Sequence, residues 1–441
     1  MSEPAPGLTR LRRGHAPNCS SAGAFVGIAL GSAVAAAAIL NAFAARFLGE
    51  GSGGTAQGGA GPRLRDEPDG GALHDPETGA LLHVDPATAA RLRAQGVPGW
   101  GAGTAPSGAL TAPTEVHFAV TERCPAACDG CYLDAGPNRG GQVPERAALF
   151  HDLEALAAQG VFEVAFGGGE ALLRDDVVAL CEHARDLGLV PNLTTSGFGL
   201  TAELASRLAP IVGQVNVSLD GLGDDYVAVR GWDGTGLGLR ALELLQGAGI
   251  RTGVNTVLSR HTWASLGSLG DQLAARGVRE WQWLRLKPAG RGASVYRDQA
   301  LTPDQALGLW PLALEIEART GLLLRWDCAL VPWLAAHDLP AARLRRLGVT
   351  GCTGGETLLA RHADGSWAPC SFVPGQAASD PGRAWLDGDT LQAWRTRAAA
   401  PPEPCASCDH RTVCRGGCRA VAAFVTGDPL APDPECPRVR A

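Results

Sequence analysis

Three cysteines, Cys124, Cys128 and Cys131, lie within a stretch of eight residues in the spacing CxxxCxxC. A loop this short can direct three thiolates at one point, and thiolates are the ligands that iron–sulfur centres require. Three ligands leave one iron of a four-iron cluster open to a group that is not protein. Zinc sites usually combine two CxxC-like halves, and the neighbouring sequence contains no second half. The spacing therefore favours a four-iron cluster.

The loop also resembles the defining motif of the radical S-adenosylmethionine (SAM) superfamily, in which an aromatic residue, here Tyr132, follows the third cysteine. A glycine-rich turn, FGGGEALL, comes further along the chain and contains Gly168, Gly169 and Glu170. Glycines allow a backbone to approach a ligand closely, and a carboxylate can pair with an ammonium group. The turn matches the family's GGE motif, which holds the methionine amino group of SAM. Ala171 stands where the family commonly has proline.

Three later segments match further motifs of the same family. Ser196 ends the polar run TTS, at a position where polar residues face the cofactor. The segments SLDG and VRG supply Ser218, Asp220 and Arg230. In relatives the serine contacts ribose or carboxylate, and the arginine pairs with the SAM carboxylate. Leu286 lies in RLKPAGRG, which resembles the segment whose backbone touches adenine. The resemblance therefore implies SAM as a cofactor, with these residues and those of the glycine-rich turn as its contacts.

Apolar strands alternate with amphipathic helices between residues 113 and 327. The predicted strands are 116–121, 161–167, 190–195, 214–219, 251–257 and 280–286. The predicted helices between them lie near 144–159, 176–187, 201–209, 236–249 and 262–276. This alternation indicates βα units on a parallel sheet with right-handed crossovers. The fold class is therefore α/β, and six units suit the partial six-stranded TIM-like barrel, (β/α)6, of the radical SAM family. Function is expected at the carboxyl ends of the strands.

A second group of cysteines follows a predicted helix at 303–320 and a predicted strand at 322–326. Its members are Cys352, Cys370, Cys405, Cys408, Cys414, Cys418 and Cys436. Their spacing resembles the seven-cysteine SPASM domain, a loop-rich iron–sulfur domain with two auxiliary four-iron clusters. We assign this domain to residues 328–441. A zinc ribbon is the chemical alternative for the CxxC part of the segment, but it does not account for the cysteines at either end.

Two fully ligated four-iron clusters need eight thiolates, and the motif supplies seven. By the family's pattern the outer cluster takes Cys405, Cys408, Cys414 and Cys436, and the inner cluster takes Cys352, Cys370 and Cys418. Cys328, just upstream, is the best candidate for the missing ligand. The alternative is an open iron that a substrate thiolate could occupy. With the first loop, the resemblance implies three [4Fe-4S] clusters.

The amino-terminal part of the chain divides into three segments. Residues 1–47 form a polar arm followed by an uncharged run at 24–45, which is long enough to cross a bilayer as a helix. We interpret 24–45 as a candidate membrane-associated helix. An alanine-rich helix packed on a partner, a signal peptide with a poor motif, and a fused peptide with Cys19 as a modifiable residue are the alternatives. Residues 48–71 are a glycine-rich linker.

Residues 72–112 are predicted to form a small hairpin, turning at 75–79, and then a short helix from Pro86. One interpretation is a cap on the barrel entrance. The other is a peptide-docking element, because an exposed hairpin edge can receive a peptide strand by β-augmentation.

Composition limits the partners and the compartment. The net charge is −7 and the basic residues are spread thinly, so no electrostatic footprint for nucleic acid is present. Lys287 is the only lysine of the chain, which we interpret as a coding bias. The 13 cysteines cluster at metal-binding spacings. Such clustering indicates metal ligation in a reducing compartment, so we expect a cytoplasmic enzyme, with membrane association through residues 24–45 as the open question.

The resemblance implies an oxidoreductase that cleaves SAM reductively to a 5′-deoxyadenosyl radical. Among SPASM proteins the expected substrate is a ribosomally made peptide (a RiPP precursor), with a thioether or carbon–carbon cross-link as product. The alternative is similar to the anaerobic sulfatase-maturing enzymes, which form formylglycine. A membrane-tethered iron–sulfur electron carrier is the non-enzyme hypothesis, and the complete SAM motif set argues against it. A flavodoxin or ferredoxin is the expected reductant. The sequence identifies no catalytic acid or base.

Overall fold

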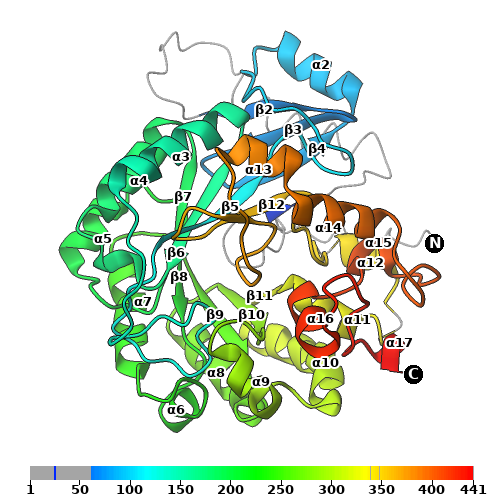
Figure 1. Ribbon diagram of the computed structural model, residues 1–441. Helices are drawn as coiled ribbons and strands as arrows, with labels where there is room; N and C mark the ends of the chain where they lie inside the picture. The colour runs from blue at the N-terminus through cyan, green and yellow to red at the C-terminus, as the bar shows by residue number, and fades with distance from the viewer. Residues whose placement is uncertain (1–23, 26–60, 338, 347, 441) are drawn as a thin grey trace, which may run out of the picture.

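The computed structural model describes residues 24–25, 61–337, 339–346 and 348–440 (Figure 1). Its centre is a sheet with the strand order β11-β10-β9-β8-β7-β6-β5-β12-β13. The six predicted strands are β5 (Glu115–Thr121), β6 (Glu163–Gly168), β7 (Val190–Thr195), β8 (Val215–Ser218), β9 (Thr252–Leu258) and β10 (Glu280–Arg285). Each pairs in parallel with the next. The predicted α/β fold is therefore confirmed.

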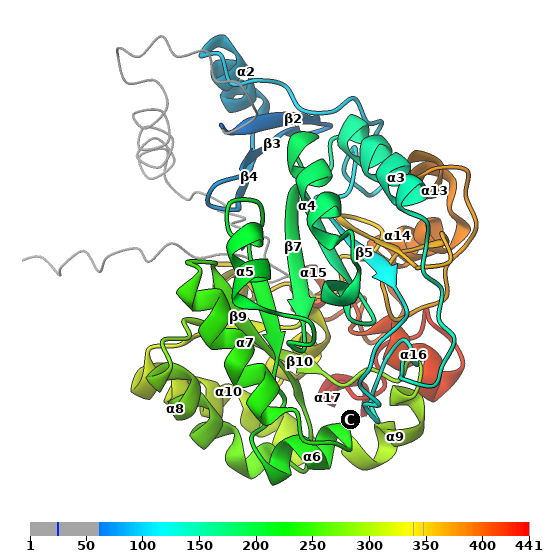
Figure 2. The same ribbon diagram turned by 90° about the vertical axis from the view of Figure 1, so that its left-hand side faces the viewer.

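Helices follow the strands and cover the outside of the sheet, as Figure 2 shows for α3, α4, α5 and α7. The predicted helices are α3 (Arg146–Gln159), α4 (Val177–Asp186), α5 (Ala202–Leu208), α7 (Thr235–Gly247), α8 (Leu266–Ala275) and α10 (Pro303–Thr320). Two further helices, α6 (Asp224–Arg230) and α9 (Gly292–Gln299), lie at the carboxyl ends of β8 and β10. Helix α10 begins with a capping box between Thr302 and Gln305 and ends at Gly321 in the left-handed conformation, which fixes its length.

Further strands extend the same sheet on both sides. Strand β11 (Leu323–Trp326), predicted at 322–326, pairs in parallel with β10, and β12 (Leu358–Arg361) of the carboxyl-terminal domain pairs in parallel with β5. Strand β13 (Trp367–Ala368) closes this side as an antiparallel partner of β12. A six-stranded sheet would leave β5 as an unpaired edge, and β12 covers it. The prediction missed this shared sheet.

The rest of this domain consists of short helices joined by loops. They are α11 (Val331–Leu334), α12 (Ala341–Arg346), α13 (Pro381–Asp387), α14 (Asp389–Ala399), α15 (Arg411–Cys414), α16 (Arg419–Thr426) and α17 (Pro437–Arg440), with a 3-10 turn at Cys328–Leu330. Ion pairs between β10 and the segment at 433–435 join the domain to the barrel, since Arg285 contacts Asp433 at 2.6 Å and Glu435 at 2.7 Å.

An amino-terminal module precedes the barrel. It comprises β2 (Arg63–Glu67), β3 (Gly70–Asp75), β4 (Ala80–Val84) and α2 (Pro86–Ala94). The predicted hairpin and helix are therefore present, but residues 63–67 are a strand where the sequence predicted linker. Strand β2 pairs antiparallel with β3, so its polar sequence, RLRDE, is stabilised by backbone pairing. Strand β1 (Ala24–Phe25) pairs in parallel with β4.

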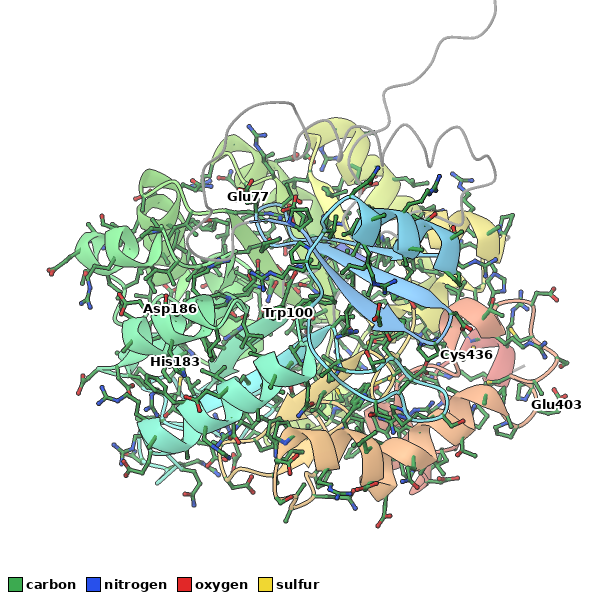
Figure 3. The ribbon with its side chains drawn as sticks, turned by 90° about the horizontal axis from the view of Figure 1, so that it is seen from above. Glu77, Trp100, His183, Asp186, Glu403 and Cys436 are labelled. Carbon is green, nitrogen blue, oxygen red and sulfur yellow. The ribbon has the colours of Figure 1, made fainter. Side chains whose placement is uncertain are left out.

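The module packs against the amino-terminal ends of the barrel strands. Arg65 Nη1 donates to the carbonyl oxygens of Pro113, at 2.9 Å, and Gly160, at 2.7 Å, just before β5 and β6. His74 of β3 contacts Glu163, the first residue of β6, at 3.2 Å. Figures 2 and 3 show the module covering this end of the barrel. The expected cap on the barrel entrance is therefore wrong in its position, because the arginines of β2 satisfy carbonyl groups at the opposite end.

Among the helices of the described ranges, none is long and apolar enough to cross a membrane. Apart from Ala24 and Phe25, the predicted membrane-associated segment at 24–45 lies outside the described residues, as does Cys19.

Candidate active site

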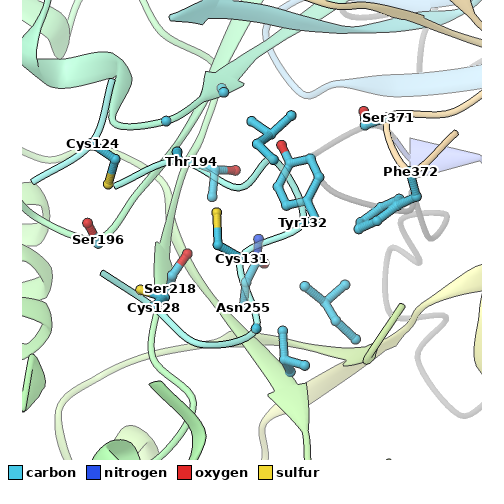
Figure 4. A pocket seen from close by; sticks show the side chains of 18 of the residues that line it. Cys124, Cys128, Cys131, Tyr132, Thr194, Ser196, Ser218, Asn255, Ser371 and Phe372 are labelled. Carbon is cyan, nitrogen blue, oxygen red and sulfur yellow. The ribbon is translucent and has the colours of Figure 1, made fainter. Parts of the chain in front are cut away.

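A large pocket opens at the carboxyl ends of the barrel strands (Figure 4). Its empty volume is about 1600 Å³ when the space open to solvent at the mouth is counted. Residues of the barrel and of the carboxyl-terminal domain, among them Ser371 and Phe372, line it together. Its lining includes every residue that the motifs predicted: Cys124, Cys128, Cys131, Tyr132, Gly168, Gly169, Glu170, Ser196, Ser218, Asp220, Arg230 and Leu286.

The glycine-rich turn after β6 packs directly against the start of the cysteine loop. Gly168 has a φ of +114°, and a Cβ atom on it would overlap the carbonyl oxygen of Thr121. A Cβ atom on Gly169 would overlap the carbonyl oxygen of Arg123. The Gly169 amide donates to Thr121 at 2.6 Å, and the Glu170 amide donates to Arg123 at 2.9 Å. Both glycines are therefore required to bring Glu170 beside the cysteines.

Glu170 is a buried carboxylate surrounded by donors. Its Oε1 accepts a hydrogen bond from Thr195 Oγ1 at 2.7 Å, and its Oε2 accepts from the Ser196 amide at 2.9 Å and from Ser196 Oγ at 2.6 Å. Burial raises the pKa of Glu170, and the hydrogen bonds from Ser196 and Thr195 oppose that shift. An ammonium group that entered the pocket would meet an acceptor already held in place by three donors.

Asp220 and Arg230 form an ion pair on the next wall of the pocket. Arg230 Nε donates to Asp220 Oδ2 at 2.6 Å, and Asp220 Oδ1 accepts from the Val257 amide at 2.7 Å. Burial alone would lower the pKa of Arg230, but Asp220 and the Cys128 thiol help to raise it well above its ordinary value. Arg230 Nη1 also lies 3.6 Å from Cys128 Sγ, and Trp232 Nε1 lies 3.2 Å from it. Two donors therefore already face this sulfur.

The segment after β10 clamps the cysteine loop from the other side. Arg291 Nε and Nη2 donate to the Cys128 carbonyl oxygen at 2.9 and 2.8 Å, and Nη2 also donates to Ala135 at 2.6 Å. A Cβ atom on Gly290, whose φ is +53°, would lie 2.6 Å from the Cys131 carbonyl oxygen. The loop is thus held by its backbone, which leaves the three thiols facing the pocket (Figure 4).

The three thiols of this loop suit a metal cluster. Burial raises the pKa of Cys124 to about 11, and Glu170, Cys128 and Cys131 add to the shift. Three half-buried thiols beside the buried Glu170 carboxylate are an unfavourable arrangement for negative charge unless a cation lies between them. A four-iron cluster supplies that positive charge to thiolates. The donor set therefore fits such a cluster.

The wall opposite the cysteine loop comes partly from the carboxyl-terminal domain. Phe372 packs on Tyr132 with ring centroids 4.8 Å apart, and Ser371 Oγ lies 3.0 Å from His117 Nδ1. Burial lowers the pKa of His117 to about 3, and the charge of Lys287 adds to the shift. The imidazole is therefore neutral at physiological pH. This wall carries the polar and aromatic groups that a second molecule in the pocket would meet.

The carboxyl-terminal cysteines fall into two spatial groups. In the inner group, burial raises the pKa of Cys370 to about 12, and the charges of Cys352 and Cys418 add to the rise. Burial also raises the pKa of Cys418 to about 11, while Arg285 and Lys287 oppose the shift. These two cations fit a cluster with bound thiolates, because they offset its negative charge.

The outer group consists of Cys405, Cys408, Cys414 and Cys436. Burial raises the pKa of Cys405 and of Cys414, and each shift contains a contribution from another member of the group. A hydrogen bond from the Arg397 side chain, together with its positive charge, opposes the rise in the pKa of Cys405. A guanidinium group in this position is suited to an anionic cluster.

No group of three or more His, Cys, Asp and Glu residues in the described ranges is arranged to hold a single metal ion. A four-iron cluster binds each thiolate to a different iron, so its ligands do not need to converge in that way. Cys328 begins the 3-10 turn Cys328–Leu330, next to Asp327. Its ligation of the inner cluster stays a prediction.

Several residues of the site were missed from the sequence. Arg291 lies inside the quoted segment RLKPAGRG, and Trp232 directly follows the segment VRG, so the motifs could have drawn attention to them. His117 and Ser371 come together from β5 and from a loop 254 residues later. No spacing in the sequence connects such a pair.

Known proteins share this arrangement. The family model described as the radical SAM superfamily matches residues 118–270. Mycofactocin maturase MftC of Mycobacterium tuberculosis (strain ATCC 25618 / H37Rv) is 30% identical over 342 residues, which cover 74% of this chain and 83% of the relative. PqqA peptide cyclase of Ruegeria pomeroyi is 30% identical over 348 residues, which cover 76% of this chain and 90% of that one. The crystal structure of Streptococcus suis SuiB bound to precursor peptide SuiA has a TM-score of 0.67 at 15% identity, and covers 85% of this chain and 98% of that one. The chain therefore belongs to the radical SAM superfamily.

Proposed function

We propose that this enzyme is a peptide maturase that forms a thioether or carbon–carbon cross-link in a ribosomally made peptide. One observation carries the proposal. The pocket with the SAM motifs has a second wall, formed by His117, Lys287 and Phe372, beside the inner cysteine group. The names of the relatives, a mycofactocin maturase and a PqqA peptide cyclase, and the precursor peptide bound to SuiB support a peptide substrate.

In this proposal Cys124, Cys128 and Cys131 hold a [4Fe-4S] cluster. The inner auxiliary cluster is held by Cys352, Cys370 and Cys418, with Cys328 as the candidate fourth ligand. The outer auxiliary cluster is held by Cys405, Cys408, Cys414 and Cys436. Bound SAM supplies a 5′-deoxyadenosyl radical that can take a hydrogen atom from a substrate.

The chain's own residues bind and orient the cofactor in this proposal. Glu170, with its three donors, accepts the methionine ammonium group. Arg230, held by Asp220, pairs with the methionine carboxylate. Ser218 contacts the ribose or carboxylate, and the backbone at Leu286 lies against the adenine. Tyr132 and Phe372 shield the space between SAM and the peptide from water.

The reaction removes two hydrogen atoms from the peptide. One leaves with the 5′-deoxyadenosyl group as 5′-deoxyadenosine, and the other leaves as a proton and an electron, which an auxiliary cluster would accept. A flavodoxin or ferredoxin is the proposed reductant for the cleavage of SAM.

The test uses the full chain, reconstituted with iron and sulfide without oxygen. About twelve irons per chain are expected for three four-iron clusters. Reduction in the presence of SAM should give 5′-deoxyadenosine, and the Cys128→Ala variant should not. The peptide encoded by a short reading frame beside the gene should then lose two hydrogen atoms. About four irons, or conversion of a sulfatase peptide to formylglycine without cross-linking of that peptide, contradicts the proposal.

A further inference from the structure

Lys287 occupies an unusual position for a lysine. It is the only lysine in the sequence, and its exposed fraction is 4%. It lines the pocket two residues after the end of β10. Lysine is rarely buried unless its charge is paired, because desolvation of an ammonium group is costly. A buried lysine in a chain that otherwise uses arginine needs a physical reason.

Its contacts hold the ammonium group in one place. Nζ forms an ion pair with Asp327 Oδ2 and lies 4.5 Å from the centroid of the Phe372 ring. Asp327 is itself fixed, because its two oxygens accept from the Arg285 amide at 3.0 Å and from the Ala329 amide at 3.2 Å. The ion pair and the cation–π contact compensate the burial of the charge.

The ammonium group acts in two directions. On the pocket side it contributes to the low pKa of His117. On the other side Phe372, which Nζ touches, follows Cys370 of the inner cysteine group by two residues. Nζ also donates to the Arg285 carbonyl oxygen at 3.4 Å, and the Arg285 side chain shares Asp433 with the amide of Cys418, another member of the group. The charge of Lys287 therefore lies between the pocket and the inner cysteine group.

The size of the space explains the choice of lysine. Arginine has a planar, forked head, whereas the lysine ammonium group is a compact point charge. The space for Nζ is bounded by the Asp327 carboxylate and the Phe372 ring, and a Cβ atom on Gly292 would lie 2.8 Å from the Lys287 carbonyl oxygen. A guanidinium group would have to displace one of these neighbours.

We propose that Lys287 holds one positive charge between the substrate pocket and the inner cysteine group, and that this charge raises the reduction potential of the four-iron cluster bound there. A cluster gains one negative charge when it is reduced, so a nearby cation stabilises the reduced form more than the oxidised form. The inference rests on the proposed function, because it needs the inner auxiliary cluster.

The experiment measures midpoint potentials in the full chain with Cys124, Cys128 and Cys131 all replaced by alanine. Only the two auxiliary clusters then remain, and about eight irons per chain are expected. Lys287→Met should shift one couple to a more negative potential, with about a tenfold smaller equilibrium constant for reduction, or about 59 mV for one electron. The other couple is the internal reference and should not shift to the same extent.

Two further variants test the direction of the shift and its dependence on the position of the charge. Asp327→Asn removes the counter-charge and should move the same couple in the positive direction. Arg207→Met removes one positive charge from the exposed surface of α5 and should leave both couples unchanged. If Lys287→Met does not retain eight irons, the double variant Lys287→Gln with Asp327→Asn leaves no unpaired buried charge and is compared with Asp327→Asn alone, relative to which a negative shift is expected.

The two ways of failing are distinct. Fewer than about eight irons in the starting triple variant contradicts the proposed auxiliary clusters themselves. A full iron content with no selective shift in Lys287→Met, or in the double variant, overturns the role of Lys287 and leaves the proposed function intact.

Discussion

Strand β6 has a buried carboxylate near each end. Glu163 is its first residue, and Glu170 follows its last residue by two positions. The exposed fractions are 3% and 2%, and burial raises the pKa of both, for Glu163 to about 8. Desolvation by burial is therefore the main cause of the raised pKa at both ends of the strand. Their surroundings differ, and that difference separates a binding site from a structural contact.

Glu170 borders the open pocket, whereas Glu163 is enclosed. Three donors from Thr195 and Ser196 hold Glu170, and the pocket gives a cation access to it. Glu163 accepts from Asn192 Nδ2 at 2.8 Å and contacts His74 of the amino-terminal module. A perturbed pKa therefore indicates function here only together with an accessible pocket.

The largest effect is expected from Glu170→Gln. The variant removes the negative charge that we assign to the SAM ammonium group, and a buried charge-assisted contact contributes about 3 kcal/mol, or about 100-fold in the dissociation constant. Titration of the reconstituted enzyme with SAM measures this constant. The melting temperature should change little, because glutamine keeps one acceptor for Thr195 and Ser196.

Glu163→Gln is the matched control for this prediction, since it makes the same chemical change at the other end of β6. It should leave SAM binding unchanged. The comparison breaks down if both variants weaken SAM binding equally, or if Glu170→Gln binds SAM like the unmodified enzyme.

A smaller effect is expected from the donors around each carboxylate. Ser196→Ala removes the hydroxyl that donates to Glu170 at 2.6 Å, and the loss of one hydrogen bond of about 1 kcal/mol should weaken SAM binding about fivefold. Asn192→Ala removes the donor to Glu163 and should instead lower the free energy of unfolding by about 1–3 kcal/mol. Binding and urea unfolding are measured for both variants. An equal loss of SAM affinity in Asn192→Ala would show that the two ends of β6 are not independent.

The difference between the two ends also explains what the sequence could predict. Glu170 follows a run of glycines, and such a run indicates a close approach of the backbone to another group. Its motif can therefore be recognised in the sequence. The strands and helices of the barrel were predicted within a few residues because apolar periodicity fixes them locally. Glu163 stands in FEVAF, where nothing marks the carboxylate as buried. Its burial depends on His74, which lies 89 positions earlier in the sequence.

The carboxyl-terminal domain repeats this lesson. Four of its cysteines, Cys405, Cys408, Cys414 and Cys418, follow a compact spacing that is visible in the sequence, whereas the division of all seven between two clusters stays a prediction. By contrast, the pairing of β12 with β5 brings together residues 358–361 and 115–118. The position of Lys287 against Asp327 and Phe372 likewise depends on three separate segments. Such long-range contacts have no local signal in one sequence.

A further expected effect is a change in how stability depends on pH. Glu163 keeps its proton in the folded protein up to a pKa of about 8, whereas an unfolded glutamate loses it near its ordinary value. Between about pH 5 and pH 8 the folded state therefore binds more protons than the unfolded state, and stability falls as the pH rises. This one group contributes at most about 1.4 kcal/mol per pH unit. Glu163→Gln should remove that slope.

Urea unfolding at several pH values between 5 and 8 measures the difference between the unmodified chain and the variant. Burial lowers the pKa of His74 to about 3. His74 is present in both proteins, so its contribution cancels in the difference and only that of Glu163 remains. Glu203→Gln, at an exposed position of α5, is the control and should keep the original slope. If the difference does not vary with pH, Glu163 is ionised inside the folded protein. Its partners at the amino-terminal end of β6 would then stabilise a charge, as the donors around Glu170 do.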